Sequence, residues 1–361
     1  MSDNALRTSI AGIDLTSPIL LAAGTAGVLS EMRDVLDPTQ LGGIVTKSIT
    51  KDVRHGNPFP RITFARAGMM NAIGLANPGI DAFVRDEGPK ASSMGCPIIG
   101  SVAGDRLDDY LEVATKLASI DGIRAIEANV SCPNVHSGLE FGSDPAALKD
   151  LISAMSGAIG DVALFVKLSP ITVGTPNTIV DLARVAIESG AKGLTLTNTV
   201  PAMGIDVRTR KPILANVTGG LSGPAIHPIV VRLVHLVYRG IAKDAGVPII
   251  AAGGVTRWED AAEFILAGAR SADRRGELCV ASCEREDAEG ARQVGPHAGR
   301  VERVGSGGSG QARLITRAID SPRRLRGSTS SVRTTRRMCA ISSTRSRCVR
   351  ATIADHHRTR V

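Results

Sequence analysis

The sequence predicts an α/β fold, a TIM-type (β/α)8 barrel, over residues 1–269, and three observations support it. Short apolar runs alternate with amphipathic helical patterns, which is typical of parallel β/α units. Seven such units are recognisable. Polar and glycine-rich motifs repeatedly follow the ends of the predicted strands, as in a barrel whose site lies at its carboxyl-terminal face. A doubly wound open sheet is the alternative, but it would concentrate its chemistry at one crevice.

The seven strands are predicted from short apolar runs bounded by turn residues. In chain order they are Ile19–Ala22, Gly43–Thr46, Pro97–Val102, Arg124–Asn129, Ala163–Leu168, Gly193–Thr197 and Pro248–Ala251. After Ala269 the chain turns to arginine and serine, and we expect the eighth unit to be missing or replaced by a tail. Its loss would leave the first and seventh strands with unpaired edges, which predicts poor folding and weak cofactor retention.

Four helices between these strands have recognisable ends. Apolar residues recur at helical spacing after Asp105. Asp144-Pro145 and Thr175-Pro176 each combine an N-cap residue with proline at the first helical position. Thr256 with Glu259 predicts a capping box, and Gly268 predicts the end of that helix.

The net charge of +8 belongs to the last quarter of the chain. Residues 1–269 hold 23 Lys and Arg against 26 Asp and Glu, whereas residues 270–361 hold 20 against 9. All 20 tail cations are arginine, and the tail has no Phe, Tyr or Trp. We therefore expect a disordered Arg- and Ser-rich tail at 270–361, separate from the 1–269 domain. Nucleic-acid binding by the tail is an alternative, but arginine without interleaved aromatic residues does not favour it.

The composition also bounds location and metal chemistry. We find neither a secretory leader nor an apolar stretch near the length of a membrane span, and we expect a cytoplasmic protein without membrane contact. Four of the six cysteines, Cys279, Cys283, Cys339 and Cys348, lie in the tail at spacings that match zinc sites poorly. No metal site is predicted.

The fourth strand leads into a polar segment that contains a candidate catalytic thiol. Cys132 follows the strand end among Asn129, Ser131 and Asn134. A lone cysteine is more often a small core residue. Hydrogen-bonding neighbours are costly to bury for packing alone, however, and a partly ionised thiol can act as a base.

Lysines and glycines at other strand ends indicate an anion site. Lys47 and Lys167 each follow an apolar run, and two ammonium groups at one rim suit a phosphate, a carboxylate or an anionic flavin. Glycines gather at 219–223 before a helix and at 253–254 after the seventh strand, where barrels often bind phosphate. A polar cluster at 69–79 lies in an insertion after the second strand, which we expect to be a lid or a substrate loop.

Taken together, these segments resemble the class 1 dihydroorotate dehydrogenases, specifically the catalytic subunit of the B type. The matching stretches run in family order through residues 10–269, and they are Lys47-Ser48, Gly56 to Arg61, Asn71 to Leu75, Asn129 to Asn134, Val166 to Ser169, Thr197 to Thr199, Gly219 to Pro224 and Gly253-Gly254. The catalytic cysteine separates class 1 from the membrane-bound class, which uses serine.

The resemblance implies one FMN per chain and oxidation of dihydroorotate to orotate in pyrimidine biosynthesis. Cys132 would remove the C5 proton, and Lys167 would stabilise the reduced flavin. The substrate would be held by Lys47, Asn71, Ala72, Ile73, Gly74, Leu75, Asn129, Asn198 and Thr199. FMN would be lined by Ala23, Lys47, Ser48, Ser101, Asn129, Lys167, Thr197, Gly223, Gly253 and Gly254. A homodimeric core with an FAD and iron–sulfur subunit that passes electrons to NAD is the implied assembly.

The sequence departs from the family pattern at three places. Ala23 stands where the family often has serine, and Ser101 stands where the B type usually has asparagine. The final strand with its Val-Gly-Thr phosphate loop does not follow Ala269, as a shifted reading frame would produce. Two alternatives therefore stay open: an inactive or flavin-deficient homologue, and a flavin oxidoreductase that acts on another pyrimidine.

Overall fold

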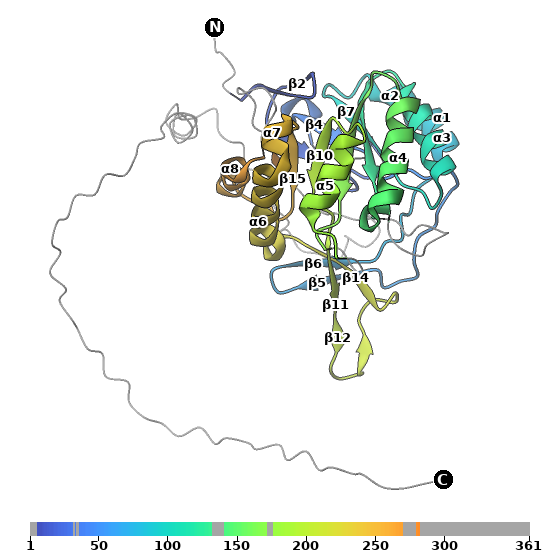
Figure 1. The fold of residues 1–361 in the computed structure, drawn as a ribbon. Coiled ribbons are helices and arrows are strands. Elements are labelled where there is room, and N and C mark those ends of the chain that lie inside the picture. The colour runs from blue at the N-terminus through green and yellow to red at the C-terminus, as the bar shows by residue number, and fades with distance from the viewer. Residues whose placement is uncertain are drawn as a thin grey trace, which may run out of the picture. The chain divides into compact units, whose positions relative to one another are not determined.

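Eight parallel strands close into a barrel in the computed structural model (Figure 1). The structure describes residues 6–31, 33, 36–131, 141–171 and 176–269, and the backbone of 279–281. The barrel order is β10-β15-β16-β3-β4-β7-β8-β9. In chain order these strands are β3 (Ile19–Leu21), β4 (Gly43–Val45), β7 (Ile98–Val102), β8 (Ile123–Asn129), β9 (Ala163–Leu168), β10 (Gly193–Leu196), β15 (Ile249–Ala252) and β16 (Cys279–Ala281).

The seven predicted strands are confirmed to within one residue at each end. The closed order excludes the doubly wound open sheet. The expectation that the eighth strand is missing was wrong, because β16 pairs in parallel with both β15 and β3. The edges of β15 and β3 offer a row of backbone donors and acceptors, and a three-residue segment is enough to bridge them. A strand that short has no periodicity for a sequence pattern to detect.

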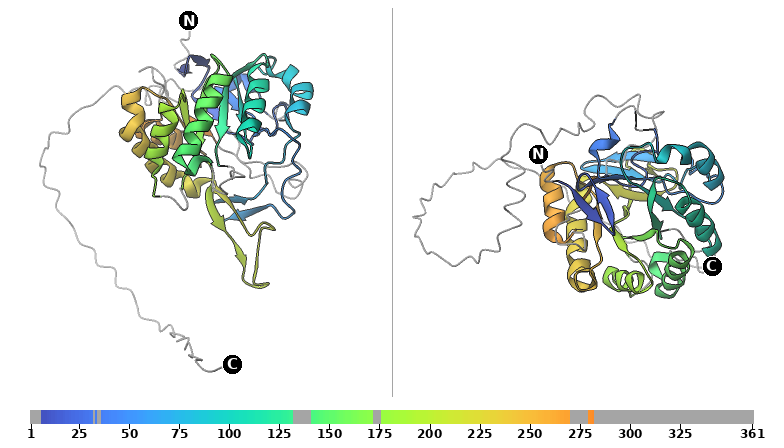
Figure 2. Two further views of the ribbon diagram at one scale, coloured as in Figure 1. Left: turned by 45° about the vertical axis from the view of Figure 1, so that its right-hand side comes forward. Right: turned by 90° about the horizontal axis from the view of Figure 1, so that it is seen from above.

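The helices cover the outside of the barrel, as the two views of Figure 2 show. They are α1 (Ile80–Asp86), α2 (Gly88–Ala91), α3 (Leu107–Ala118), α4 (Pro145–Ala158), α5 (Ile179–Glu188), α6 (His227–Val237), α7 (Lys243–Ala245) and α8 (Trp258–Ala267). Shorter helical turns lie at Pro38–Gln40, Phe141–Ser143, Pro224–Ile226 and Tyr238–Ala242.

One predicted helix start and one predicted helix end are confirmed. The Asp144 side chain accepts hydrogen bonds from the backbone of Ala146 and Ala147 at the start of α4. Gly268 ends α8 with φ +124°, a conformation that favours glycine.

Two predicted helix starts were wrong. α5 begins at Ile179, because Thr178 and Asp181 cap each other's backbone N–H, and Thr175 lies outside the described residues. That reciprocal pair satisfies two N-terminal donors at once. At the start of α8 the capping acceptor is Asp260 and not the predicted Glu259. Its carboxylate accepts from the backbone N–H groups of Thr256 and Arg257.

The segment Pro224–Ala245, which includes α6 and α7, is by length and composition apolar enough to cross a membrane. This corrects the expectation that no such stretch exists. Val230, Val234 and Val237 on its inner face are fully buried in the core shared with the barrel strands. Packing against the barrel therefore accounts for part of its apolar character.

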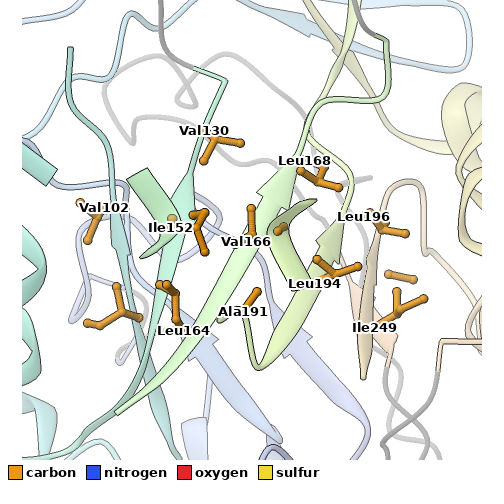
Figure 3. Close-up of a cluster of buried hydrophobic side chains, with 14 of the residues drawn as sticks. Val102, Val130, Ile152, Leu164, Val166, Leu168, Ala191, Leu194, Leu196 and Ile249 are labelled. Atoms are coloured by element: carbon orange, nitrogen blue, oxygen red, sulfur yellow. The ribbon is translucent and has the colours of Figure 1, made fainter. Parts of the chain in front are cut away.

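Two hydrophobic cores hold the barrel together. One lies between the strands and the helices, where residues such as Val166 of β9 and Ile152 of α4 meet (Figure 3). The other fills the bore with residues such as Leu20, Ile99 and Phe165. Gly193 makes room for the last of these, since a Cβ there would lie 2.2 Å from the Phe165 ring.

The amino-terminal end of the bore is covered by a hairpin, β1 (Thr8–Ile10) and β2 (Ile13–Leu15). Ile10 and Leu15 are buried in the same cluster as the bore residues. The opposite, carboxyl-terminal end of the barrel is therefore the end left for a site.

A second, antiparallel sheet lies at that opposite end (Figure 1). Its order is β11 (Val200–Met203), β14 (Thr218–Ser222), β6 (Gly68–Asn71) and β5 (Ile62–Ala65). Strands β5 and β6 come from the insertion after β4, whereas β11 and β14 come from the crossover after β10. A small hairpin, β12 (Ile205–Asp206) and β13 (Lys211–Pro212), extends from the latter. The sheet thus joins two crossovers that are far apart in sequence.

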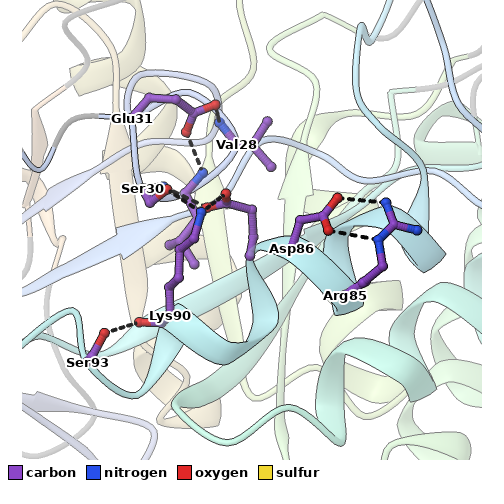
Figure 4. Close-up of polar contacts among 9 residues, drawn as sticks. Val28, Ser30, Glu31, Arg85, Asp86, Lys90 and Ser93 are labelled. Carbon is purple, nitrogen blue, oxygen red and sulfur yellow. Dashed lines mark hydrogen bonds and ion pairs between the residues drawn. The ribbon is translucent and has the colours of Figure 1, made fainter.

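The loop after β3 is tied by polar contacts to α2 and to Glu87, the residue between α1 and α2 (Figure 4). The backbone N–H of Ser30 donates to Glu87 at 3.1 Å, and Lys90 donates to the Ser30 hydroxyl at 3.1 Å. Glu31 accepts from the backbone of Val28 at 2.9 Å. These contacts fix the described part of the loop that carries Ala23 and Gly24.

Candidate active site

The carboxyl ends of β7, β8, β9 and β10 bring polar side chains to one rim. Asn129 at the end of β8 is the cross-strand neighbour of Lys167 on β9, which in turn neighbours Thr195 on β10. Ser101 of β7 lies opposite Glu127 of β8. Alternation along each strand places all these residues on the inner face of the barrel.

A chain of hydrogen bonds connects four of the predicted site residues. The hydroxyls of Ser48 and Ser101 lie 2.9 Å apart, and Asn129 Nδ2 donates to the Ser48 hydroxyl at 3.2 Å. Asn198 Nδ2 donates to Asn129 Oδ1 at 3.2 Å. Ser48, Ser101 and Asn129 are buried, so the network satisfies polar groups that would otherwise be costly to bury.

The same network extends to residues that flank the predicted thiol. Asn198 Nδ2 also lies 3.1 Å from the Ser131 hydroxyl, which is 2.8 Å from the Ser169 hydroxyl. Asn198 Oδ1 accepts from the backbone N–H of Thr199 at 2.8 Å. The structure therefore holds Asn198 and the residue before Cys132 together. Cys132 itself and Asn134 lie outside the described residues.

The two predicted lysines differ in their surroundings. Lys167 is 7% exposed, and its side chain makes no hydrogen bond or ion pair with any residue that the structure describes. Lys47 follows β4, and its Nζ would lie 3.4 Å from a Cβ at Gly24. A buried ammonium group is costly unless acceptors surround it, so Lys167 is a candidate position for contact with an anionic or acceptor-rich ligand.

Two glycine loops meet beside the rim. Gly223 and Gly254 have φ of +88° and +72°, and a Cβ on Gly254 would lie 2.6 Å from the carbonyl oxygen of Gly223. Gly253 has φ +149°, also a conformation that L side chains rarely adopt. Gly223 leads through a helical turn into α6, so backbone N–H groups at a helix start lie next to this contact. Such an arrangement suits a phosphate group.

The insertion contributes a rigid loop from Asn71 to Leu75. Ala72 and Ile73 are buried, and the side chain of Asn57 donates to the carbonyl of Ala72 at 2.9 Å. Gly74 and Leu75 have positive φ, and the buried Asn77 side chain donates to the Leu75 carbonyl at 2.8 Å. Two side chains outside the loop, Asn57 and Asn77, therefore hold its backbone.

Strand β14 brings that loop to Thr199. Asn71 pairs with Gly220, and a Cβ on Gly220 would lie 1.8 Å from the Thr199 hydroxyl. Only glycine allows this approach.

Of the remaining predicted residues, Thr197 is buried and donates its hydroxyl to the carbonyl of Asn198 at 2.9 Å. Ala23 is half-buried after β3 and packs against the hydrophobic cluster that fills the bore. No cluster of metal-binding side chains occurs within the described ranges.

A family profile described as dihydroorotate dehydrogenase matches residues 5–274. The chain belongs to the dihydroorotate dehydrogenase family. The resemblance inferred from the motifs is thus confirmed, and the chain is an oxidoreductase of a flavin-dependent family that oxidises dihydroorotate in pyrimidine biosynthesis.

Curated relatives of both class 1 types are similar to this dihydroorotate dehydrogenase family member. Dihydroorotate dehydrogenase A (fumarate) of Lactiplantibacillus plantarum is 45% identical over 269 residues, which cover 74% of this chain and 85% of that protein. The catalytic subunit of dihydroorotate dehydrogenase B (NAD(+)) of Fusobacterium nucleatum is 42% identical over 265 residues, which cover 73% and 84%. The corresponding subunit of Bacillus pumilus is 43% identical over 265 residues, which cover 73% and 83%.

Two buried ionisable residues of the rim region were missed in the sequence. Glu127 is 1% exposed and accepts from the Thr195 hydroxyl at 2.8 Å. His227 is 7% exposed at the start of α6. The signal for Glu127 was a carboxylate inside an otherwise apolar strand, since a charged residue is rarely buried there without a partner.

Proposed function

We propose that this chain oxidises dihydroorotate to orotate with one FMN bound at the rim, and that electrons pass to NAD through a partner subunit. The observation that carries the proposal is the buried Lys167 beside the Asn129–Asn198 network, in a chain that belongs to this family. Among the described residues no side chain accepts from that ammonium, and an anionic ligand can supply the acceptor.

The described residues fit FMN. A Cβ at Gly223, Gly253 or Gly254 would lie 2.6–2.8 Å from neighbouring protein atoms, so these loops pack closely as glycine, and their bare backbone can approach a phosphate. Lys167 can stabilise negative charge on a flavin ring. The full set that would line FMN is Ala23, Lys47, Ser48, Ser101, Asn129, Lys167, Thr197, Gly223, Gly253 and Gly254. When bound, FMN supplies the acceptor for the hydride that leaves C6 of dihydroorotate.

The protein residues then account for binding and for the proton. The Asn71–Leu75 loop, Asn198 and Thr199 offer amide and backbone groups for the pyrimidine ring, and Lys47 offers a cation for the carboxylate. We assign removal of the C5 proton to the Cys132 thiolate, which requires prior loss of the thiol proton. Ser131, the preceding residue, is held by Ser169 and Asn198.

Anaerobic reduction of the purified full-length chain tests this proposal. We expect a flavin absorbance that bleaches on addition of dihydroorotate and does not bleach with dihydrouracil, which lacks the carboxylate. Cys132→Ser should slow bleaching about a hundredfold and shift its pH profile, because a hydroxyl is a much weaker base at neutral pH. Cys96→Ser is the matched control and should bleach like the wild type.

Other results would refute parts of the proposal. A colourless protein would favour the flavin-deficient homologue, and equal bleaching by dihydrouracil would favour another pyrimidine as substrate. An unchanged rate in Cys132→Ser would remove that residue as the base.

The electron acceptor and the assembly rest on the relatives' names. Two relatives described above are catalytic subunits of a B (NAD(+)) enzyme, whose name implies a separate subunit, and one is an A (fumarate) enzyme. We propose a cytoplasmic homodimeric core with an FAD and iron–sulfur subunit. Rapid reoxidation of the reduced chain by fumarate, without any partner, would overturn the B-type assignment.

A further inference from the structure

A backbone donor fixes the orientation of the Asn198 side chain. An amide side chain has two N–H donors on its nitrogen and an oxygen with two lone pairs. The backbone N–H of Thr199 lies 2.8 Å from Asn198 Oδ1. Because a backbone N–H can only donate, the oxygen and not the nitrogen of Asn198 must lie against it. The nitrogen therefore lies on the side of Asn129 and Ser131.

Both amide hydrogens of Asn198 are used inside the protein. Nδ2 donates to Asn129 Oδ1 at 3.2 Å and to the Ser131 hydroxyl at 3.1 Å. The backbone N–H of Ser131 donates to the same Asn129 Oδ1 at 3.4 Å, which places the oxygen of that second amide on this side as well. Two hydrogens thus meet two acceptors. What Asn198 can offer to a ligand is the second lone pair of its oxygen.

Ser169 holds the hydroxyl that accepts from Asn198. It follows directly after β9, is 6% exposed, and its hydroxyl lies 2.8 Å from that of the half-buried Ser131. A serine side chain has three staggered positions, and the contact with Ser169 favours the one in which the Ser131 oxygen meets Asn198. The backbone N–H of Asn198 donates to the carbonyl of Leu168 at 3.0 Å, so the same two strand ends are also joined through their backbones.

The pair of serines could act instead on the proposed base, because Ser131 precedes Cys132. The contacts that the structure describes for the Ser131 side chain lead elsewhere, to Asn198 and Ser169. Its backbone N–H leads to Asn129. These contacts favour a role in substrate binding over a role in proton transfer.

We propose that Ser131 and Ser169 are positioning residues for the substrate, which hold the Asn198 amide so that its oxygen, and not its nitrogen, is offered to the pyrimidine ring. The inference rests on the proposed function. A ring N–H of dihydroorotate or orotate is a donor that suits this oxygen. Loss of either serine hydroxyl frees the amide to turn, and the substrate then binds more weakly.

Orotate binding to the FMN-loaded full-length chain, followed by the change in flavin absorbance, tests this inference. We expect Ser131→Ala to raise the Kd for orotate about fivefold, the effect of one lost hydrogen bond between neutral groups. Ser169→Ala should raise it by a similar factor. The double variant should bind no more weakly than Ser131→Ala, because Ser169 acts through Ser131. Ser169→Thr keeps the hydroxyl and should bind orotate within about twofold of wild type. Ser156→Ala, at a half-buried serine of helix α4, is the matched control.

Steady-state oxidation of dihydroorotate separates binding from catalysis. In Ser131→Ala and Ser169→Ala, KM should rise with the Kd for orotate, while kcat should change less than about twofold. A fall in kcat at constant KM would show that the two hydroxyls act on the segment of Cys132, and it would overturn the inference.

The remaining outcomes distinguish this inference from the proposed function. A wild-type chain that binds neither FMN nor orotate overturns both. A wild type that binds orotate, while Ser131→Ala and Ser169→Ala keep its Kd within about twofold, overturns the inference alone. A double variant that shows the product of the two single effects does the same, because the hydroxyls then act independently. Thermal melting shows whether each variant folds, and the half-buried Ser131 variant decides the question if the Ser169 variants do not fold.

Discussion

The Thr195→Val substitution tests how much one hydrogen bond to the buried Glu127 carboxylate stabilises the fold. The Thr195 hydroxyl donates to Glu127 Oε2 at 2.8 Å, and Glu127 is 1% exposed, so solvent cannot replace the lost donor. Ser101 Oγ lies 3.5 Å from the other carboxylate oxygen, at the limit of a hydrogen bond. Valine matches threonine in shape, so the substitution removes little more than the hydroxyl. A hydrogen bond to a charged group contributes about 1.5–3 kcal/mol, and we expect a loss of about 2 kcal/mol in the free energy of unfolding.

Urea unfolding of the full-length apoprotein, followed by circular dichroism, measures that loss. The corresponding drop in melting temperature should be about 4–8 °C for a domain of this size. Thr195→Ser retains the hydroxyl and should recover most of the difference. A Thr195→Val protein within about 0.5 kcal/mol of wild type would refute the reasoning. A Thr195→Ser protein as unstable as Thr195→Val would show that packing, and not the hydrogen bond, decides the effect.

Three further predictions concern the proposed substrate loop, a helix cap and a half-buried thiol. Gly220→Ala should raise KM for dihydroorotate at least about tenfold in steady-state assays, because the added Cβ would lie 1.8 Å from the Thr199 hydroxyl. Gly157→Ala is the control: its Cβ meets open space, and KM should be unchanged. Asp144→Ala should lower the free energy of unfolding by about 1 kcal/mol in urea titrations, because two N-terminal donors of α4 lose their acceptor, and Asp144→Ser should restore it. Burial raises the pKa of the Cys96 thiol from 9.0 to about 12, so the folded state keeps a proton that the unfolded state releases. Stability should therefore fall as the pH rises above 9, and a Cys96→Ala variant with the same slope would contradict this.

The barrel could be predicted because its signals are local. Ala163–Leu168 is a continuous apolar run bounded by turns, and its predicted ends agree with the structure at both residues. The Asp144-Pro145 cap is likewise decided by two adjacent residues. β16 could not be predicted in the same way, because Cys279–Ala281 is a strand only through the neighbours that it pairs with.

The arrangement of the candidate site was predictable where polar residues and glycines follow strand ends. Lys167, Asn129 and the glycines of the two loops follow strand ends, and parallel strands bring such ends to one rim. Glu127 and His227 were missed because each is held by a partner far away in sequence. Thr195 is 68 residues from Glu127, and Gly253, whose carbonyl contacts His227, is 26 residues from it. No spacing rule connects such pairs. Cys132 lies outside the described residues, and its catalytic role stays a prediction.

The shared sheet at the carboxyl-terminal end of the barrel has a consequence for exchanging parts between relatives. Strand β6 of the first crossover pairs with β14 of the other, and Gly220 lies against both Asn71 and Thr199. A graft that replaced one crossover alone would leave its former partner strand with an unsatisfied backbone edge and mismatched side chains. The two segments therefore form one structural unit, and we expect a graft to keep the sheet intact only when both are moved together.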